Sequence, residues 1–120
     1  MTRPFEGIKI IDVTHVLAGP FAAYQLAVLG ADVIKVEPLN GDVFRYVRPG
    51  HHKDMGAGFI NCNRNKESIA VDLTSEEGQE IVRRLVAGAD VVVHNMRPKS
   101  TKKLGIDFET LKAIKPDLVY

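Results

Sequence analysis

The sequence contains a single cysteine, Cys62, so no disulfide bond can form within the chain. Such usage is typical of proteins from a reducing compartment. No apolar run is long enough to span a membrane, and the first residues, MTRPFEG, lack the apolar segment of a secretory signal. We therefore expect a soluble cytoplasmic protein that does not act in a membrane.

An excess of charge of one sign is also missing. The 16 Lys and Arg residues balance 15 Asp and Glu residues, which leaves a formal net charge of +1. The chain as a whole is therefore not a basic nucleic-acid binder. With 120 residues, of which 45% are apolar and 26% charged, it has a globular composition and enough length for one compact core.

The histidines do not form a metal-binding pattern. His15 has no second ligand at a suitable spacing, and the adjacent His51 and His52 cannot face one site from a regular element. No serine or cysteine stands at a strand-to-helix elbow where a histidine could activate it. We therefore expect neither a zinc site nor a nucleophile of that type.

Strand-like and helix-like segments alternate along the chain. Residues 8–13 and 32–37 are short and rich in β-branched side chains, and residues 21–29 between them are rich in Ala and Leu. Pro20 suits the first position of this helix, and Gly30 suits the position just after its end. This order predicts a right-handed βαβ unit with parallel strands.

A second unit repeats the order. Residues 68–73 predict a strand, and the words TSEE predict a capping box in which Thr74 is the N-cap residue of the next helix. Residues 90–93 predict another strand, and residues 104–114 another helix, capped by Asp107. The alternation indicates an α/β fold, namely a Rossmann-like open, mostly parallel sheet with helices on both faces.

Two segments do not fit a closed domain. Residues 38–65 form a long connection rich in Gly, Asn and charge, with one short helix or strand within residues 56–62, and loops of such length usually have a function. The last residues, DLVY, resemble the start of a strand and are followed by no turn. We expect residues 1–120 to be the N-terminal part of a domain that is incomplete as given.

The junction after the first strand, DVTHVLAGPFA, has one glycine, Gly19. A dinucleotide-binding turn needs three, one of which lets the pyrophosphate approach the backbone. An NAD or FAD site in an oxidoreductase is therefore disfavoured, and Glu37 is then simply a polar strand end. The junction still precedes a helix at the edge where parallel sheets bind ligands, so an anionic ligand and an ordinary capped turn both fit it.

Basic residues gather at three places along the chain, and a polyanionic small molecule would suit them. For any single one of them, a solvated surface is the simpler explanation. The three groups are Arg45, Arg48, His51, His52 and Lys53; Arg64 and Lys66; and Arg97, Lys99, Lys102 and Lys103.

Several words in a fixed order connect the sequence to a known family. LAGP, GADVIKVE, NRNK and KKLGIDFETLKAIKPDLVY follow one another between Pro4 and Tyr120. In this combination the chain resembles the start of family III CoA-transferases, a group that includes formyl-CoA transferase, carnitine CoA-transferase and α-methylacyl-CoA racemases. The resemblance implies a Rossmann-like domain that binds coenzyme A in a several-fold longer enzyme with a second domain, assembled as an interlocked homodimer. Such an enzyme moves CoA between an acyl-CoA and a free carboxylic acid.

The resemblance also assigns residues to CoA. It implies contacts from the turn after the first strand, from the word VDLT, from the end of the strand before Pro98, and from a basic residue before Leu104. These residues are Leu17, Ala18, Val71, Asp72, Leu73, Thr74, Asn95, Met96, Arg97 and Lys103. The family's nucleophilic aspartate is expected beyond Tyr120, so no catalytic residue and no metal ligand is assigned within this chain.

Two positions depart from formyl-CoA transferases. Leu17 stands where they have glutamine, which argues against an oxalate and formyl substrate pair. Pro38 stands where they have arginine, so Arg45 or Arg48 would have to contact the phosphate or adenine instead. An acyl-CoA racemase of the same family, which moves a proton next to the thioester, and a non-catalytic CoA-binding module are the alternatives.

Overall fold

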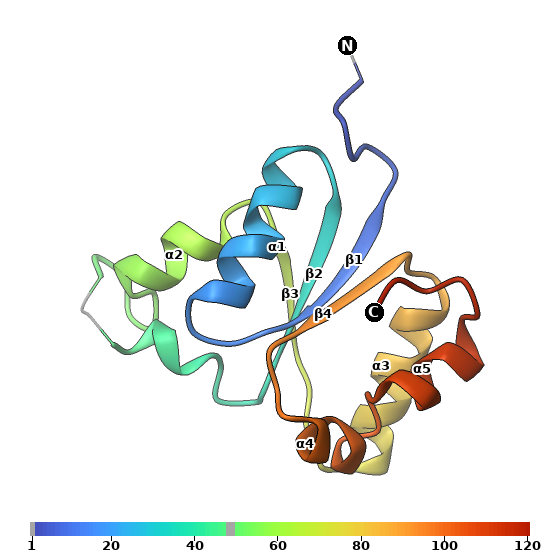
Figure 1. Ribbon diagram of the computed structural model, residues 1–120. Helices are drawn as coiled ribbons and strands as arrows, with labels where there is room; N and C mark the ends of the chain where they lie inside the picture. Colours follow the sequence, from blue (N-terminus) through green and yellow to red (C-terminus); the bar gives the residue numbers. More distant parts are fainter. Residues whose placement is uncertain (1, 48–49) are drawn as a thin grey trace.

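The computed structural model describes residues 2–47 and 50–120 (Figure 1). Within these residues four strands form one parallel sheet in the order β3-β2-β1-β4. The strands are β1 (Lys9–Val13), β2 (Asp32–Glu37), β3 (Glu67–Ala70) and β4 (Val91–His94). The chain therefore moves outward from β1 to β3 and then returns to the other side of β1, which is the pattern of a doubly wound sheet.

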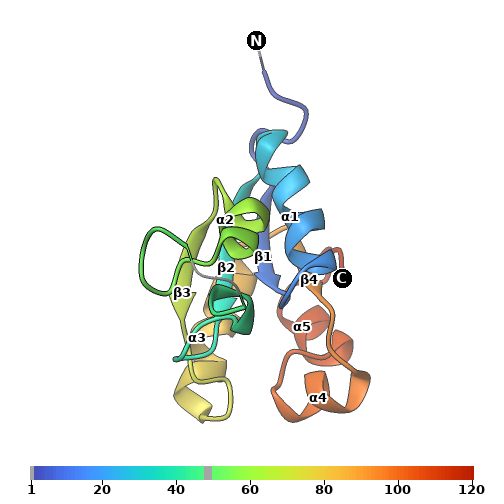
Figure 2. The same cartoon turned by 90° about the vertical axis from the view of Figure 1, so that its left-hand side faces the viewer.

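Helices cover both faces of the sheet (Figures 1 and 2). One face carries α1 (Ala18–Val28) and α2 (Ala57–Asn63), which contact each other, and α2 also contacts the short turn η1 (Val43–Arg45). The other face carries α3 (Glu76–Ala87) and α5 (Phe108–Ile114), and α4 (Pro98–Lys103) lies below the end of β4 in Figure 1. None of the helices in these residues combines the length and apolar character needed to cross a bilayer.

The strands divide their side chains between two apolar cores. On one face Ile10 and Val33 pack with Ala23, Ala27 and Ala31, whose small side chains let α1 approach the sheet closely. On the other face a larger cluster includes Ile11, Val13, Val36, Val82, Val86 and Leu111. The separation of Ile10 from Ile11 follows from the two-residue period of a strand, and it explains why these segments are almost entirely apolar.

The first βαβ unit confirms most of its prediction. β1 and β2 are parallel, and Gly30 has a φ of 112° just after α1. Its N–H donates to Ala27 O at 3.1 Å, and the N–H of Ala31 donates to Leu26 O at 3.0 Å, the two bonds of a Schellman motif. The start of the helix was placed too late, because α1 begins at Ala18. Pro20 is still tolerated there, since N–H groups in the first turn have no intrahelical partner.

The second unit requires three corrections. Ser75, and not Thr74, is the N-cap residue of α3, and its Oγ accepts from Gly78 N at 3.0 Å. The Thr74 hydroxyl instead donates to Asp72 Oδ1 at 2.6 Å. β3 ends at Ala70, so the word VDLT follows the strand as a turn. The helix α4 was not predicted, and DLVY forms one parallel bridge, between Val119 and Val91.

Candidate functional site

A cavity of about 420 Å³ opens at the edge of the sheet where the parallel strands end. Segments that follow all four strands contribute to its wall, which consists of Val13, His15, Val36, Glu37, Pro38, Leu39, Asn40, Val71, Asp72, Leu73, Thr74, Met96 and Leu104. The predicted CoA contacts Val71, Asp72, Leu73, Thr74 and Met96 are thus brought together. Ligands of open α/β sheets bind at this edge.

The other predicted contacts surround the cavity without lining it. Arg97 follows Met96, and Lys103 precedes Leu104 at the end of α4. Both side chains are exposed, as are those of Leu17 and Ala18 at the start of α1. A second hollow, of about 740 Å³, lies between α4, α5 and Tyr120; it reaches the end of only one strand, at His94, and none of the predicted contacts lines it. The smaller cavity is therefore the better candidate.

Asn95 connects two of the strand ends. Its Oδ1 accepts from His15 N at 3.1 Å, and its Nδ2 donates to His15 O at 2.9 Å. The side chain predicted to contact CoA therefore fastens the segment after β4 to the segment after β1. By holding the His15 backbone, Asn95 fixes the position of one residue of the cavity wall.

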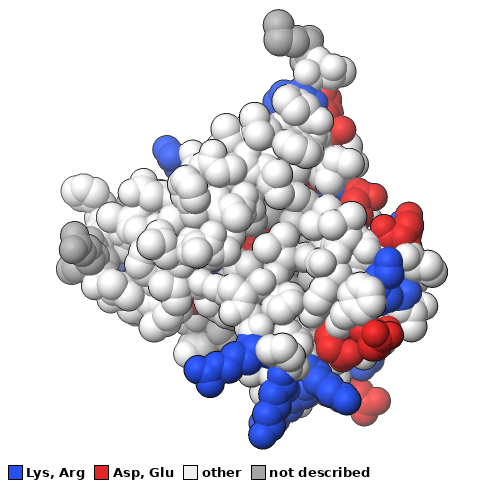
Figure 3. Space-filling view, viewed as in Figure 1, with Lys and Arg blue, Asp and Glu red and all other residues white. Residues whose placement is uncertain are grey.

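Positive charge lies beside the cavity. Figure 3 shows Lys and Arg side chains gathered at the lower edge of the molecule, where Figure 1 places α4. The exposed basic residues in and before this helix are Arg97, Lys99, Lys102 and Lys103. An anion at the mouth of the cavity would lie close to them, which favours a phosphate-bearing ligand.

The turn between β1 and α1 has an unusual backbone. Val16 has a φ of 70°, although the left-handed region is disfavoured for a β-branched residue. Three residues further on, the chain passes so close to Thr14 that a Cβ on Gly19 would lie 2.5 Å from the Thr14 Cβ. Only glycine fits there. The N-cap residue Leu17 has no side-chain acceptor, so the first amides of α1 carry a partial positive charge without a side-chain cap.

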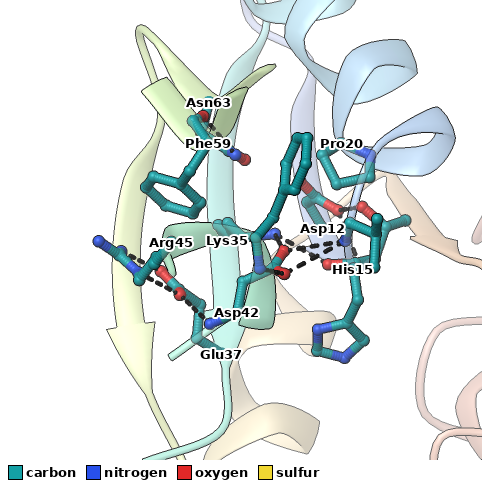
Figure 4. A network of polar contacts seen from close by, with 12 residues as sticks. Asp12, His15, Pro20, Lys35, Glu37, Asp42, Arg45, Phe59 and Asn63 are labelled. Atoms are coloured by element: carbon teal, nitrogen blue, oxygen red, sulfur yellow. Dashed lines mark hydrogen bonds and ion pairs between the residues drawn. The ribbon is translucent and has the colours of Figure 1, made fainter. Parts of the chain in front are cut away.

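Three buried ion pairs involve residues of β1 and β2 or the segment that follows β2, and Figure 4 labels both partners of two of them, Lys35 with Asp42 and Glu37 with Arg45. Asp12 pairs with Lys66 at 2.7 Å, Lys35 with Asp42 at 3.1 Å, and Glu37 with Arg45. Apart from Arg45, which is 18% exposed, the paired side chains are at most 2% exposed. Buried charges are tolerated when they are paired and hydrogen-bonded, and within the described residues no buried side-chain nitrogen or oxygen lacks a partner.

Glu37 is more than a polar strand end. It accepts from Arg45 Nε at 2.8 Å, from Asp42 N at 2.8 Å and from Ser68 Oγ at 2.7 Å. Burial raises the pKa of Glu37, but the hydrogen bonds from Arg45, Asp42 and Ser68 outweigh it and lower the pKa to about 2. Its acceptors are used within the protein, so Glu37 does not resemble a ribose ligand.

The same contacts correct two other expectations. Arg45 uses its guanidinium on Glu37 and stacks over the Phe59 ring at 3.8 Å, so it is not free to contact a ligand phosphate. Arg48, the other candidate, lies outside the described residues. Lys66, predicted to attract a polyanion, donates to Asp12, Pro20 O and Asn63 Oδ1 at 2.7–2.9 Å and is buried.

His15 is the titratable cavity residue whose role in a site the sequence analysis set aside. Its ring points away from the ion pairs in Figure 4 and lines the cavity. Burial lowers the pKa of His15 more than the nearby Asp42 carboxylate raises it. The imidazole is therefore neutral at pH 7, when one nitrogen can donate and the other accept a hydrogen bond. In residues 2–47 and 50–120, no three His, Cys, Asp or Glu side chains form a group that could hold a metal.

Comparisons with known proteins identify relatives of this chain. Succinate–glutarate CoA-transferase from Agrobacterium fabrum is 43% identical, over 98% of this chain and 31% of its own length. Formyl-CoA:oxalate CoA-transferase from Streptomyces avermitilis is 38% identical, over 100% of this chain and 29% of its own length. This chain therefore spans about a third of the length of these relatives.

Solved structures agree. A CAIB/BAIF family protein from Brucella suis is 45% identical with a TM-score of 0.94, and the match covers 100% of this chain and 33% of that one. A short chain dehydrogenase/reductase family protein, 16% identical with a TM-score of 0.53, shares the fold alone. The sequence model of CoA-transferase family III matches residues 5–120. The chain, as its motifs predicted, belongs to CoA-transferase family III.

Proposed function

We propose that this chain supplies the CoA-binding part of an enzyme that moves CoA between an acyl-CoA thioester and a free carboxylic acid. The observation that supports this most is the cavity of about 420 Å³ at the strand ends, in a chain of CoA-transferase family III. The proposed enzyme is an interlocked homodimer of the cytoplasm and uses no metal.

The lining of the cavity suits a CoA molecule. Val13, Val36, Leu39 and Met96 offer apolar contacts for the pantetheine chain. The basic side chains around α4 are placed to bind phosphates, with Arg97 and Lys103 as the proposed contacts. The proposed contacts at Leu17 and Ala18 come from the backbone, because a helix N-terminus presents N–H groups to a polar or anionic group.

The proposed reaction needs a carboxylate that this chain does not offer freely. A carboxylate oxygen attacks the thioester carbonyl, the C–S bond breaks, and CoA leaves as the thiolate while an acyl anhydride forms. Asp12, Glu37 and Asp42 cannot attack, because each is buried and committed to a cationic partner. As the family resemblance implies, the nucleophilic aspartate is proposed to follow Tyr120 in the complete enzyme.

Leu17 bears on the substrate. An apolar side chain at this position argues against the oxalate and formyl pair, because the polar group found in formyl-CoA transferases is missing. Relatives named for succinate and glutarate match this chain at 43% identity. Succinyl-CoA is therefore the first acyl donor to assay, with glutarate as the first acceptor.

Calorimetric titration of the full-length protein with CoA and with NAD tests the proposal. We expect CoA to bind and NAD to bind more weakly, since the turn lacks the glycines that a pyrophosphate needs. Incubation with succinyl-CoA and glutarate should then produce a new thioester, which chromatography would detect. Tighter binding of NAD than of CoA would contradict the proposal.

A further inference from the structure

Val16 is held in its left-handed conformation by something other than packing. Its side chain is 43% exposed, so apolar contacts do not account for a φ that a branched residue avoids. A residue persists in such a conformation only where its surroundings impose it. Asn95 fixes the preceding residue, His15, through both backbone groups. The remaining explanation for this conformation is the hydrogen bond that the Val16 backbone N–H donates.

That bond goes to Asp42, from a different segment of the chain. Val16 N donates to both carboxylate oxygens of Asp42, at 3.2 Å each (Figure 4). The carboxylate is 0% exposed and also receives Lys35 Nζ at 3.1 Å. The same Nζ donates to Thr14 O at 2.8 Å, so one ammonium group connects Asp42 with the start of the turn.

Asp42 is itself fixed from two further sides. Its backbone N–H donates to Glu37 Oε2 at 2.8 Å, and its Oδ1 accepts from Phe44 N at 2.9 Å. Glu37 in turn is paired with Arg45. The carboxylate therefore sits at a defined place relative to β2, and a charged acceptor makes a stronger hydrogen bond to an N–H than a neutral one does.

We infer that Asp42 is a positioning residue for the turn between β1 and α1. Its carboxylate holds Val16 in the left-handed region and thereby orients the first backbone N–H groups of α1, at Ala18 and Gly19. Asp42 is buried and does not line the cavity of about 420 Å³, so it acts through Val16. The consequence for CoA rests on the proposed function, because Leu17 and Ala18 are the proposed contacts.

A double-mutant cycle in the full-length protein tests this. Asp42→Asn removes the charge from the acceptor and should weaken CoA binding about tenfold, within the range of coupling between contacting residues. Glycine adopts a positive φ without strain, so the Val16→Gly variant does not need the hydrogen bond to the Asp42 carboxylate to keep this backbone conformation. In the Val16→Gly background, the same Asp42→Asn change should therefore alter CoA affinity by less than about threefold.

Asp107→Asn is the matched control. Asp107 is also an N-cap carboxylate, for α5, but it lies outside the cavity of about 420 Å³. It should leave CoA affinity unchanged and show no coupling to Val16→Gly. An equal loss of CoA affinity from Asp42→Asn in both backgrounds would overturn the inference, as would no loss in either.

Amide hydrogen exchange provides a readout that needs no ligand. In the wild-type protein the Val16 N–H should be protected although its side chain is exposed. In Asp42→Asn it should exchange at least about tenfold faster, since its hydrogen bond is weakened, while Gly78, bonded to Ser75, stays as it was. If the wild-type Val16 amide exchanges at the rate of an unprotected amide, the inferred hold of Asp42 on Val16 is wrong. If that amide is protected but the protein does not bind CoA, the inferred role of Asp42 remains valid and only the proposed function is wrong.

Discussion

Glu37 shows how a single buried carboxylate can carry part of the stability of this fold. It is 2% exposed, its charge is balanced by Arg45, and three kinds of donor converge on its oxygens. Removing one partner of a buried, hydrogen-bonded ion pair is strongly destabilising, because it leaves the other charge uncompensated. Glu37 also lines the cavity, so a change in its protonation state affects the site as well as the fold.

The pH dependence of unfolding follows from its pKa. The folded pKa of about 2 lies below the ordinary value of 4.5, so the contribution of Glu37 is fully present above pH 4.5 and is lost as the pH falls toward 2. The shift corresponds to about 3 kcal/mol. Chemical denaturation at several pH values should show Glu37→Gln less stable than wild type at pH 7, with the gap narrowing toward pH 2.

Glu80→Gln is the control for that measurement, because Glu80 is an exposed partner of Arg83 and Arg84 on α3. Surface substitutions usually change stability by less than about 0.5 kcal/mol. A gap between wild type and Glu37→Gln that stays constant from pH 7 to pH 3 would show that Glu37 is not ionised below its ordinary range.

Lys103 tests the proposed phosphate contact at the end of α4. Replacing it in Lys103→Ala should weaken CoA binding by about 1–3 kcal/mol, the scale of hydrogen bonds to charged groups. It should not change which acyl group is preferred, since the charge lies outside the cavity. Calorimetry with CoA measures the effect. Lys9→Ala is the matched control, because Lys9 begins β1 at the opposite edge of the sheet. Equal affinities of both variants and wild type would place Lys103 on a merely solvated surface.

At the scale of whole elements, local sequence predicts what depends on apolar patterning and misses what depends on register. The strands, α1 and the Asp107 cap of α5 follow from runs of β-branched residues, from small apolar residues and from a capping residue. The ion pair between Lys35 and Asp42 cannot be predicted in this way, because a lysine between apolar residues of a strand suggests a side chain on an exposed face. Only the parallel pairing of β1, β2 and β3 makes that face a second interior. The helix α4, PKSTKK, was missed because Thr101 is its only buried residue among those described, so it has no apolar stripe to detect.

The shifted cap of α3 yields a discriminating prediction. Ser75 Oγ caps the helix by accepting from Gly78 N at 3.0 Å, whereas Thr74 is bonded to Asp72. Loss of an N-cap side chain costs about 1 kcal/mol. Ser75→Ala should therefore lower the unfolding free energy by about that amount without a comparable loss of CoA affinity. Thr74→Ala should weaken CoA binding without a comparable loss of unfolding free energy, since Thr74 lines the cavity. Thermal unfolding and calorimetry separate the two effects, and greater destabilisation by Thr74→Ala would restore the original capping box.

At the scale of the molecule, the doubly wound order explains why the site lies where it does. The neighbouring strands β1 and β4 lead to helices on opposite faces of the sheet, so the chain diverges after them and leaves a hollow at the strand ends. The sequence located this edge and several residues of its wall, because VDLT and NMR follow strand-like runs. It did not locate His15 or Asp42, whose contributions depend on bonds between segments 26 and 80 residues apart.

The distribution of acids over the whole chain leads to the last prediction, that these 120 residues alone bind CoA without transferring it. Asp12 and Glu37 are buried in ion pairs, and Asp32 starts β2 beside Lys9, at the edge of the sheet opposite the cavity. Asp72 lines the cavity, but hydrogen bonds from Thr74 lower its pKa, which makes its carboxylate a weaker nucleophile. Without the aspartate that is proposed to follow Tyr120, the site should hold a thioester but form no anhydride from it.

The purified 120-residue chain would be mixed with several acyl-CoA donors and free carboxylic acids, and new thioesters followed by chromatography. We expect CoA to bind and no thioester to form. Turnover at about 1–1,000 s⁻¹, as in ordinary enzymes, would show that an acid within this chain performs the chemistry. Asp72→Asn would then identify the residue: loss of that turnover would assign the attack to Asp72, the one of these four acids that both lines the cavity and lacks a cationic partner among the described residues. In that case the catalytic centre would lie on the turn after β3, not beyond Tyr120.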